Sequence, residues 1–437
     1  MSLAPRSTYP EVCVVVLNHN GGVMTIECLR ALLATNWPAG RLRVVLVDNA
    51  SMDGMAQRVE DELPSVRVVR SSVNRGFAGG NNLALRDLAH ADYVALVNND
   101  VTVGADWLAP LVETLEGDPD VGAACPKILF APSFVELTLR SPTRSQAGDR
   151  RELGVRVSGA TVDADDVWAD LQFVSGFWGP EHGRAPENQF QWTSGEATLR
   201  IPSPNGADPP RCELRLAAKT ATTVQTKSQD QIVQLTVGAA PTWFQVPLSR
   251  QKADVVNNAG NVLLDGGFGA DRGFLQLDDD RFAQPTDVFA WCGAAVLLRR
   301  SYLEDVGLLD ERLFLYYEDF ELSWRGRRRG WRYRYEPRSV VRHVHSATTG
   351  ENSRLADYYT TRNRLLILTR HASWPEIARA LVREMLVTVS YARRDIIVPL
   401  LYRRQVNREA VGRRLHAFIG YLWLAPSMIV GRVRDRF

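Results

Sequence analysis

The triplet Asn98-Asn99-Asp100 follows directly on an apolar run, Tyr93–Val97. If that run is a buried strand, Asp100 stands at its carboxyl end as an exposed carboxylate. Hard divalent cations such as Mg2+ and Mn2+ prefer oxygen ligands and can bridge a diphosphate to the protein. The same triplet is also ordinary turn chemistry. Asp100 is therefore a candidate metal ligand that needs support from other residues.

Two histidines alternate near the end of another apolar segment, at His343 and His345. Side chains two residues apart in a strand point to the same face, so both imidazoles could approach one metal ion. Isolated histidines are more often structural than catalytic. The pattern proposes one of the two as a ligand and leaves open which.

Acids lie among aromatic and aliphatic residues in the segment Phe314-Leu315-Tyr316-Tyr317-Glu318-Asp319-Phe320-Glu321. An apolar environment raises the pKa of a carboxylate and makes it a better general base for a sugar hydroxyl. An acid-rich helix start would explain Glu318 or Glu321 alone. It does not explain the whole cluster, so Asp319 and Glu318 are candidate catalytic residues.

Polar residues also end the first two apolar runs. Asn18 follows the first run, and Asp48 ends the second, where it could accept hydrogen bonds from a base or a ribose. A glycine-rich stretch, Asn74-Arg75-Gly76-Phe77-Ala78-Gly79-Gly80-Asn81-Asn82, precedes a helical pattern. A helix N-terminus of this kind attracts anions, but the stretch is not the GxGxxG of a dinucleotide site.

These residues need a sheet to position them. Short apolar runs without alternation predict buried parallel strands at Val12–Leu17, Arg43–Val47, Val66–Val69 and Tyr93–Val97. Helical patterns follow at Thr25–Ala34, Gly54–Glu62, Gly80–Ala89 and Ala105–Leu115. The first part of the chain is thus expected to be a doubly wound α/β sheet, with ligands at the carboxyl ends of its strands. Later we expect a strand at Phe289–Arg299, helices at Ser301–Val306 and Asp319–Gly330, and a last strand at Ser339–Val344.

The residue pattern changes between about Ser133 and Lys252, where short segments typical of β-strands alternate with Pro, Gly and Ser. This predicts an inserted β-sandwich. Several aromatic residues of the insertion could stack on sugars, although aromatics in a sandwich are more often core; they are Trp168, Phe177, Trp178, Trp192 and Trp243.

The last part of the chain is basic. From Arg354 to Phe437, sixteen arginines against six acids leave a net charge of +10, whereas the whole chain carries +2. The segment lacks a nucleic-acid module, so no nucleic-acid partner is expected.

The basic C-terminal segment also has two apolar runs, Ile396–Tyr402 and Ala417–Val430, which are too short and too broken by proline to span a bilayer. Arginines flank both runs, which is typical of interfacial helices; they are Arg393, Arg394, Arg403, Arg404, Arg413, Arg414, Arg432, Arg434 and Arg436. Packing on the catalytic domain or on a second subunit, as a homo-oligomer, is the alternative.

The totals fit an ordinary globular protein, with 45% hydrophobic and 23% charged residues. Five scattered cysteines without a CxxC pair suggest neither disulfides nor a zinc site. The N-terminus has no apolar run before the first strand, so no signal peptide is expected. We expect a cytoplasmic protein, peripheral on the inner face of the cell membrane.

Taken together, VVVLNHN, VLVDNASMDG, NRGFAGGNN, ALVNNDV, WCGAAVLLRR, VGLLDERLFLYYEDFELSWR and VVRHVHSATTG resemble the family 2 glycosyltransferases, in particular the bacterial rhamnosyltransferase-like subgroup. The resemblance implies a GT-A fold. The expected organisation is a catalytic domain at 1–132 and 253–353, the β-sandwich at 133–252, and a basic amphipathic helical tail at 354–437.

By this resemblance, Asp48 contacts the nucleotide and Asp100 stands where the family has the metal-binding aspartate of its DxD motif, although Asn98 departs from an acid. The implied metal ligands are Asp100 with His343 or His345, and the implied base is Asp319. The implied donor-binding positions are Asn18, Asp48, Asn74, Gly76, Asn82, Asn99, Asp100 and Gly293.

The resulting hypothesis is an inverting, metal-dependent transferase that moves a sugar from a nucleotide-diphosphate donor to a glycan or lipid-linked acceptor in cell-envelope polysaccharide synthesis. By resemblance the donor to test first is dTDP-rhamnose. A nucleotidyltransferase would use the same kind of sheet and the same metal-binding aspartate, but its reaction does not require an acidic residue as a base. A non-enzymatic sugar-binding protein would explain the sandwich and leave Asp100, Asp319 and His343 without a role.

Overall fold

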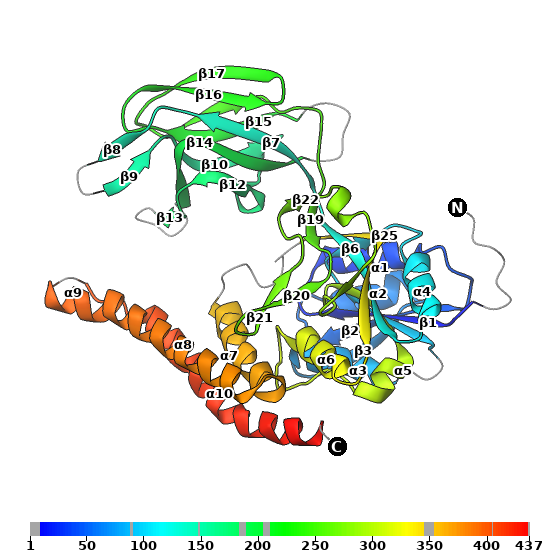
Figure 1. Cartoon of the computed structure of the whole chain (residues 1–437). Helices are drawn as coiled ribbons and strands as arrows, with labels where there is room; N and C mark the ends of the chain where they lie inside the picture. The colour runs from blue at the N-terminus through cyan, green and yellow to red at the C-terminus, as the bar shows by residue number, and fades with distance from the viewer. Residues whose placement is uncertain are drawn as a thin grey trace. The chain divides into compact units, whose positions relative to one another are not determined.

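The chain forms two compact units, seen in a computed structural model that describes residues 9–87, 91–146, 149–182, 189–203, 210–344, 354–403 and 405–435. The first unit comprises Met1–Ala131, Val256–Phe274 and Asp279–Phe437. The second comprises Pro132–Val255 and Leu275–Asp278. The chain therefore leaves the first unit after its first third, builds the second, and returns (Figure 1).

A mixed sheet forms the centre of the first unit. Its strands are β1 (Val12–Asn18), β2 (Leu42–Asn49), β3 (Arg67–Ser71), β4 (Tyr93–Asn98), β5 (Val101–Val103), β6 (Val121–Phe130), β19 (Val255–Asn258), β23 (Thr286–Val288), β24 (Ala295–Arg299) and β25 (Arg332–His343). The main order is β19-β6-β24-β4-β1-β2-β3, and β25 pairs with β6, β5 and β23. Strands β3, β2, β1 and β4 are mutually parallel, whereas β24 is antiparallel to β4.

Helices cover both faces of this sheet (Figure 1). They are α1 (Val23–Leu33), α2 (Met55–Glu62), α3 (Gly76–Leu85), α4 (Leu108–Gly117), α5 (Arg300–Val306) and α6 (Glu318–Arg327). One core cluster joins the sheet to α1, α2 and α4, and the other joins it to α3, α5 and α6. The strands are buried on both faces, which is why their sequences are continuously apolar and do not alternate.

The expected strand at Phe289–Arg299 is wrong in its first half, because β24 begins only at Ala295. The backbone just before β24 forms hydrogen bonds with side chains. The Trp291 amide donates to Ser323 Oγ, and the Gly293 amide donates to Asp319 Oδ2. The residues before β24 therefore face the acidic cluster and do not extend the sheet. Helix α3 also differs, since it begins at Gly76 and not at Gly80.

The second unit is all β. Its strands are β7 (Ser133–Arg140), β8 (Arg144–Gln146), β9 (Asp149–Leu153), β10 (Arg156–Val162), β11 (Asp165–Asp166), β12 (Gln172–Phe177), β13 (Glu181–His182), β14 (Gln189–Ser203), β15 (Cys212–Ala217), β16 (Thr222–Ser228), β17 (Gln231–Val237), β18 (Thr242–Val246) and β22 (Gln276–Leu277). The long strand β14 joins β7, β16 and β17 on one side to β10, β15 and β18 on the other. Both sets contribute to one core. Trp168 and Phe177 pack against that core, whereas Trp243 is 46% exposed.

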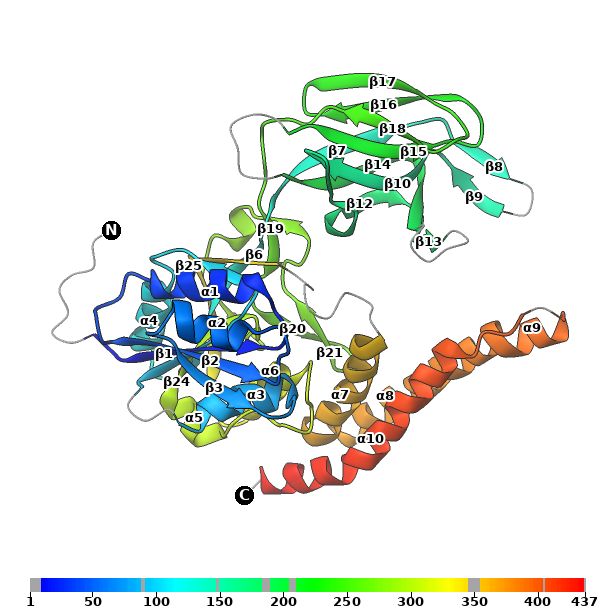
Figure 2. The same ribbon diagram turned by 180° about the vertical axis from the view of Figure 1, so that it is seen from behind.

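The C-terminal helices belong to the first unit. They are α7 (Arg354–His371), α8 (Trp374–Ala392), a π-helical turn (Arg393–Ile397), α9 (Val398–Leu401) and α10 (Glu409–Arg434), and α10 runs along α7 and α8 (Figure 2). Residues Leu365–Leu368 of α7 are buried in a core cluster with Phe320 of α6. Helix α7 is thus part of the first unit's interior. Among the described residues, no helix is long and apolar enough to cross a membrane.

Candidate active site

The carboxyl ends of β1, β2 and β4 bring the predicted polar residues to one edge of the sheet. Asn18 lies opposite Asp48 in the parallel register, and Leu17 lies opposite Asn98. Parallel strands that end together make the crevice in which α/β proteins bind ligands. The edge predicted from the sequence is therefore the one that the fold builds.

Asn18 holds this edge together. Its buried Oδ1 accepts hydrogen bonds from the Gly21 amide at 3.0 Å, Thr25 Oγ1 at 2.9 Å and Asn99 Nδ2 at 3.0 Å, and its Nδ2 donates to Ser51. These contacts use the side-chain groups that a donor would need. Asn18 and Asn99 thus position the strand ends, and their contact with a donor stays a prediction.

Asp48 is also buried, but it has fewer partners. Its Oδ1 accepts the Ser51 amide at 3.1 Å, which fixes the turn after β2. A carboxylate has about four acceptor positions on its two oxygens, so this single bond leaves it able to accept from a ligand. Asp48 remains the candidate contact for the nucleotide.

The N-terminus of α3 is closed by the protein itself, so the expectation that it attracts an anion is wrong. The amides of Phe77 and Ala78 donate to the Phe314 carbonyl at 2.6 and 3.3 Å. Gly76 has φ +68°, and a Cβ there would collide with that carbonyl oxygen. The glycine is needed because a backbone segment lies against it.

Asn74 and Asn82 likewise have structural partners. Asn74 Oδ1 accepts from the Gly76 amide and from Asn49 Nδ2, and this shapes the turn into α3. Asn82 Nδ2 donates to the Leu309 carbonyl at 2.9 Å, and its Oδ1 accepts the Leu309 amide at 3.2 Å. Both residues hold loops around the site, and neither lines the cavity described next.

A cavity of about 350 Å³ contains Glu318 and Asp319 at the start of α6. Its wall includes Asn98 from β4, Gly293, Asn261 and Asp271. Asp319 Oδ2 accepts the Gly293 amide at 3.1 Å and lies 3.4 Å from Asn261 Nδ2, while Oδ1 accepts the Phe320 amide at 2.8 Å. The carboxylate is therefore oriented by three donors inside the cavity.

The two acids differ in their environment. Burial raises the pKa of Asp319 to about 6, against the hydrogen bonds from the Phe320 and Gly293 amides, and the charge of Asp271 raises it further. Burial raises the pKa of Glu318 well above its usual range, and Asp319 adds to this shift. Glu318 Oε2 is buried without a hydrogen bond from any described residue. Burial disfavours the ionised form of Glu318 more strongly than that of Asp319, so Asp319 is the acid of this pair that ionises more readily.

The loop before α6 has an unusual backbone. Phe314, Tyr316 and Tyr317 have φ values of +66°, +66° and +70°, a region that side chains other than glycine rarely adopt. Asn363 of α7 holds this loop: its Nδ2 donates to the carbonyls of Leu313, Leu315 and Tyr316 at 2.7–2.9 Å. Helix α7 therefore sets the approach to Asp319.

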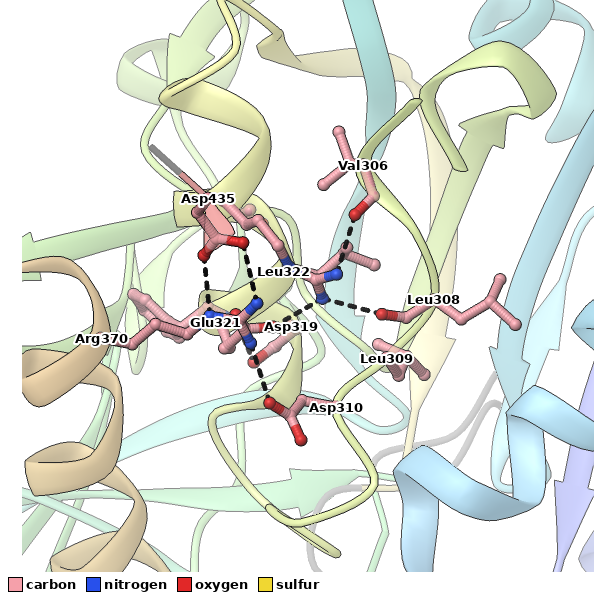
Figure 3. A network of polar contacts seen from close by, with 12 residues as sticks. Val306, Leu308, Leu309, Asp310, Asp319, Glu321, Leu322, Arg370 and Asp435 are labelled. Carbon is pink, nitrogen blue, oxygen red and sulfur yellow. Dashed lines mark hydrogen bonds and ion pairs between the residues drawn. The ribbon is translucent and has the colours of Figure 1, made fainter. Parts of the chain in front are cut away.

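A buried charge network fastens α7 to α6 (Figure 3). Arg370 of α7 lies 2.8 Å from Glu321, 2.9 Å from Asp310 and 2.9 Å from Asp435. Burial alone would raise the pKa of Glu321, but the guanidinium groups of Arg325 and Arg370 and the hydrogen bond from His371 hold it well below its usual range. Glu321 is a structural anion and not a second base.

The candidate metal ligands meet at the end of β25. His343 Nε2 lies 3.2 Å from Asp100 Oδ1, and its Nδ1 lies 3.1 Å from Asn257 Oδ1. An amide oxygen can only accept, so Nδ1 donates to Asn257 and Nε2 is the ring nitrogen that faces the carboxylate. Two ligands of an octahedral ion at about 2.1 Å each are about 3 Å apart, so this spacing fits a shared cation.

Asp100 Oδ1 is buried and accepts no hydrogen bond from a described residue, as expected of an oxygen that a cation would satisfy. Within the described part of the chain, no three His, Cys, Asp or Glu side chains gather around a metal position. The protein alone thus offers two ligands there, and a diphosphate would complete the set. His345 lies outside the described residues.

Four residues of the site were missed from the sequence. Asn257 orients His343, Asn261 and Asp271 face Asp319, and Asn363 holds the loop before α6. The segment Asn257-Asn258-Ala259-Gly260-Asn261 does carry a signal, because two amide side chains end the short strand β19 and a third follows it closely. Asn363 gives none, since it lies inside an ordinary helical pattern.

Comparison with known proteins agrees with this geometry. Residues 13–161 match the model of the glycosyl transferase family 2. This part of the chain is a family 2 glycosyltransferase domain. The chain's catalytic unit has the GT-A fold implied by the sequence resemblance. The match ends near the end of β10, inside the second unit of the chain.

Individual relatives match over short segments. An N-acetylglucosaminyltransferase of Bradyrhizobium elkanii is 32% identical over 120 residues, which are 26% of this chain and 64% of that protein. The N-acetylglucosaminyl-diphospho-decaprenol L-rhamnosyltransferase of Mycobacterium tuberculosis is 36% identical over 84 residues, 19% of this chain and 27% of that protein. The chain thus spans less than two thirds of either relative. A mannosyltransferase structure from Pyrobaculum calidifontis, in complex with GDP-Man and Mn2+, superimposes on 96% of this chain and 90% of its own with a TM-score of 0.41 and 14% identity.

Proposed function

We propose that this glycosyltransferase transfers a sugar from a nucleotide-diphosphate donor to an acceptor hydroxyl with inversion at the anomeric carbon, and that Asp319 is the general base. The observation that carries the proposal is the Asp319 carboxylate, which is held in the cavity by the Gly293 and Phe320 amides and has a pKa raised to about 6. Such a group is ionised at neutral pH yet basic enough to accept a proton.

The transfer needs one displacement. Asp319 accepts the proton of the acceptor hydroxyl, the hydroxyl oxygen forms a bond to the anomeric carbon, and the nucleoside diphosphate leaves with the electrons of the broken bond. Burial raises the pKa of Glu318 well above its usual range and disfavours its ionised form, so Glu318 is a poor second nucleophile. A single displacement inverts the anomeric configuration.

We propose Asp100 and His343 as the ligands of a divalent cation, Mg2+ or Mn2+, oriented by Asn257. The support is the 3.2 Å spacing of Nε2 and Oδ1 and the buried Asp100 oxygen without a hydrogen bond. When bound, such a cation neutralises charge on the leaving diphosphate. Asp48, with acceptor positions left over, is the proposed contact for the nucleoside.

We also propose that the C-terminal helices lie on a membrane surface, on the inner face of the cell membrane, and that the acceptor is lipid-linked or a glycan. Several apolar residues of α9 and α10 are exposed, with Leu401 75% and Trp423 84% accessible. On α8 the exposed apolar residues Val382, Met385, Leu386 and Val389 form one helical stripe. Apolar stripes of this extent mark interaction surfaces.

The structure changes the expected role of the arginines. Arg432 is buried and donates to the carbonyls of Thr369 and Ala372, while Arg413 and Arg414 form ion pairs with acids of the same unit. These side chains stabilise helix packing and contribute little to membrane attraction. Arg404 and Arg436 lie outside the described residues. The proposed membrane contact therefore depends mainly on apolar burial.

A donor screen tests the proposed function. Thermal unfolding of the full chain would be followed with each common nucleotide-diphosphate sugar, dTDP-rhamnose first, with and without Mn2+. A donor binds only the folded protein and raises Tm by mass action, so one class of donor is expected to raise it in the presence of metal. If no donor raises Tm with metal present, the proposal is contradicted.

A further inference from the structure

A second cavity of about 450 Å³ adjoins the catalytic one. We propose that it binds the phosphate or diphosphate group of a lipid-linked acceptor, an inference that rests on the proposed transferase function. Arg364, Arg383 and Arg414 are the residues that would hold the anion.

The cavity lies between the C-terminal helices and the hairpin of β20 (Asn261–Leu264) and β21 (Phe268–Asp271). It shares Gly269, Tyr317 and Thr360 with the cavity that contains Asp319. A group bound in it would therefore be adjacent to the acceptor hydroxyl that Asp319 deprotonates. None of its lining residues belongs to the proposed nucleotide or metal contacts.

Positive charge is in excess around this cavity. Arg364 and Arg414 share one carboxylate, Glu384, which is the one acidic side chain among the described residues that line it. Arg383 lies over the Phe268 ring, 5.1 Å from its centroid, and no described carboxylate is paired with it. Three guanidinium groups thus face one carboxylate, and a further anion would balance them.

The geometry suits a phosphate. Arg364 is nearly fully buried and is fixed by the Gly266 carbonyl at 2.7 Å, Glu384 at 2.9 Å and the Phe268 ring at 4.2 Å. Guanidinium groups form paired hydrogen bonds with phosphate oxygens and keep their charge in apolar surroundings better than lysine does. Burial lowers the pKa of Arg364, so a bound anion would stabilise its charged form.

The neighbouring surface favours a lipid as the source of the phosphate. Val382 and Leu386, which are 55% and 65% exposed on α8, adjoin Arg383 and Val387, which line the cavity. An isoprenoid or other acyl chain attached to a phosphate in the cavity could lie along this stripe. A soluble phosphorylated acceptor shares the phosphate and lacks the chain.

Isothermal titration calorimetry on the full chain tests the site without any need for turnover. The probes are geranyl diphosphate, geraniol and inorganic pyrophosphate, all in excess chelator so that no metal-bound diphosphate contributes. The variants are Arg383→Gln alone and Arg383→Gln with Arg414→Gln. Arg379→Gln is the control, because Arg379 is exposed on the same helix and does not line the cavity.

We expect Kd for geranyl diphosphate to rise roughly tenfold or more in the double variant, less in the single variant, and not at all in the control. Geraniol should bind weakly and equally to all four proteins. Pyrophosphate that binds as tightly as geranyl diphosphate, with the same dependence on the arginines, would support the anion site and assign it to a soluble acceptor. An unchanged Kd for geranyl diphosphate in every variant would overturn the inference.

Donor binding separates this result from the proposed function. Each variant should keep the wild-type rise in Tm with donor and Mn2+, because the arginines lie outside the donor contacts. If geranyl diphosphate binding follows the arginines while no donor is bound or turned over, the anion site stands and the transferase assignment fails.

Discussion

At the scale of single residues, the site depends on how two adjacent carboxyl groups are separated in pKa. Asp319 receives three hydrogen bonds, whereas Glu318 Oε2 receives none from the described residues. The sequence showed the acids and their apolar neighbours. It could not show which acid is ionised, because the deciding donors, Gly293 and Asn261, come from distant segments.

Asp319→Asn should lower the rate of transfer by roughly 10²–10⁴-fold while donor binding is kept, because it removes the proton acceptor and no proposed donor contact. Burial of an ionised carboxylate costs folding free energy, so Tm should not fall. The matched control is Glu318→Gln, which changes the adjacent acid and should retain most activity, because burial disfavours the ionised form of Glu318. If Glu318→Gln lost activity and Asp319→Asn kept it, Glu318 and not Asp319 would be the general base.

The pH dependence follows from the same pKa. The base must be ionised, so kcat/KM should fall as the pH drops through about 6 and should level off above it. Stability should change in the opposite sense. The raised pKa means that the folded protein retains a proton which the unfolded chain loses between about pH 4 and 6, so this group reduces stability as the pH rises through that window. A kcat/KM profile flat from pH 5 to 8 would contradict this role.

Metal dependence is the third prediction at this scale. Excess chelator should abolish transfer, and Mn2+ should restore it. Asp100→Ala should weaken donor binding strongly, and His343→Ala should weaken it less. Asn257→Ala should lower metal affinity by roughly 10–100-fold, because Asn257 only orients the imidazole of His343. Metal titrations of activity would measure each effect. Full activity in excess chelator would contradict a role for a metal ion in transfer.

At the scale of elements, α7 is the unexpected part of the site. Its sequence predicts a helix, and its arginines suggested an amphipathic tail. In the structure, Asn363 and Arg370 face inward and hold the loop and helix that carry Asp319. Strands and helices of the sheet could be predicted because their apolar patterns are local. The partners of α7 could not, because they lie about 50 residues earlier in the chain.

Asn363→Ala should remove three hydrogen bonds to a loop with three left-handed residues. We expect a loss of stability of about 1–3 kcal/mol and a larger fall in kcat than in donor affinity, because the loop precedes the base and is not part of the proposed donor contacts. Urea unfolding and steady-state kinetics would measure the two effects. Ser390→Ala on α8 is the control. A changed KM for the donor with an unchanged kcat would contradict the assigned role.

At the scale of the whole molecule, the chain combines a GT-A catalytic unit, an inserted all-β unit and apolar C-terminal helices. The change of pattern near residue 133 could be predicted because alternating β-rich segments differ from the apolar runs of a parallel sheet. The packing of α7 in the core could not be predicted from the sequence. Because α7 is part of that core, a truncation after Asn363 would cut into the catalytic unit and is unsuitable as a test of the membrane contact.

Membrane binding is better tested on the full chain by placing charges on the exposed stripes. Leu386→Glu with Trp423→Glu should abolish flotation with anionic liposomes, because both side chains are largely exposed and a buried carboxylate is costly in a lipid interface. Arg328→Glu is the control for charge, since Arg328 is exposed at the end of α6 and lies outside the C-terminal helices. Equal flotation of the double variant and the wild type, or no flotation by either at low salt, would contradict the membrane contact.

The most direct test of the central claim follows the donor itself by 1H NMR. The enzyme, with Mn2+ and the donor identified by the Tm screen, would be observed for slow transfer to water or to a simple acceptor. The account predicts release of the nucleoside diphosphate and a sugar whose first-formed anomer is inverted, with both lost in Asp319→Asn and in excess chelator. A first-formed anomer with retained configuration, or release of a nucleoside monophosphate with a sugar phosphate, would contradict it.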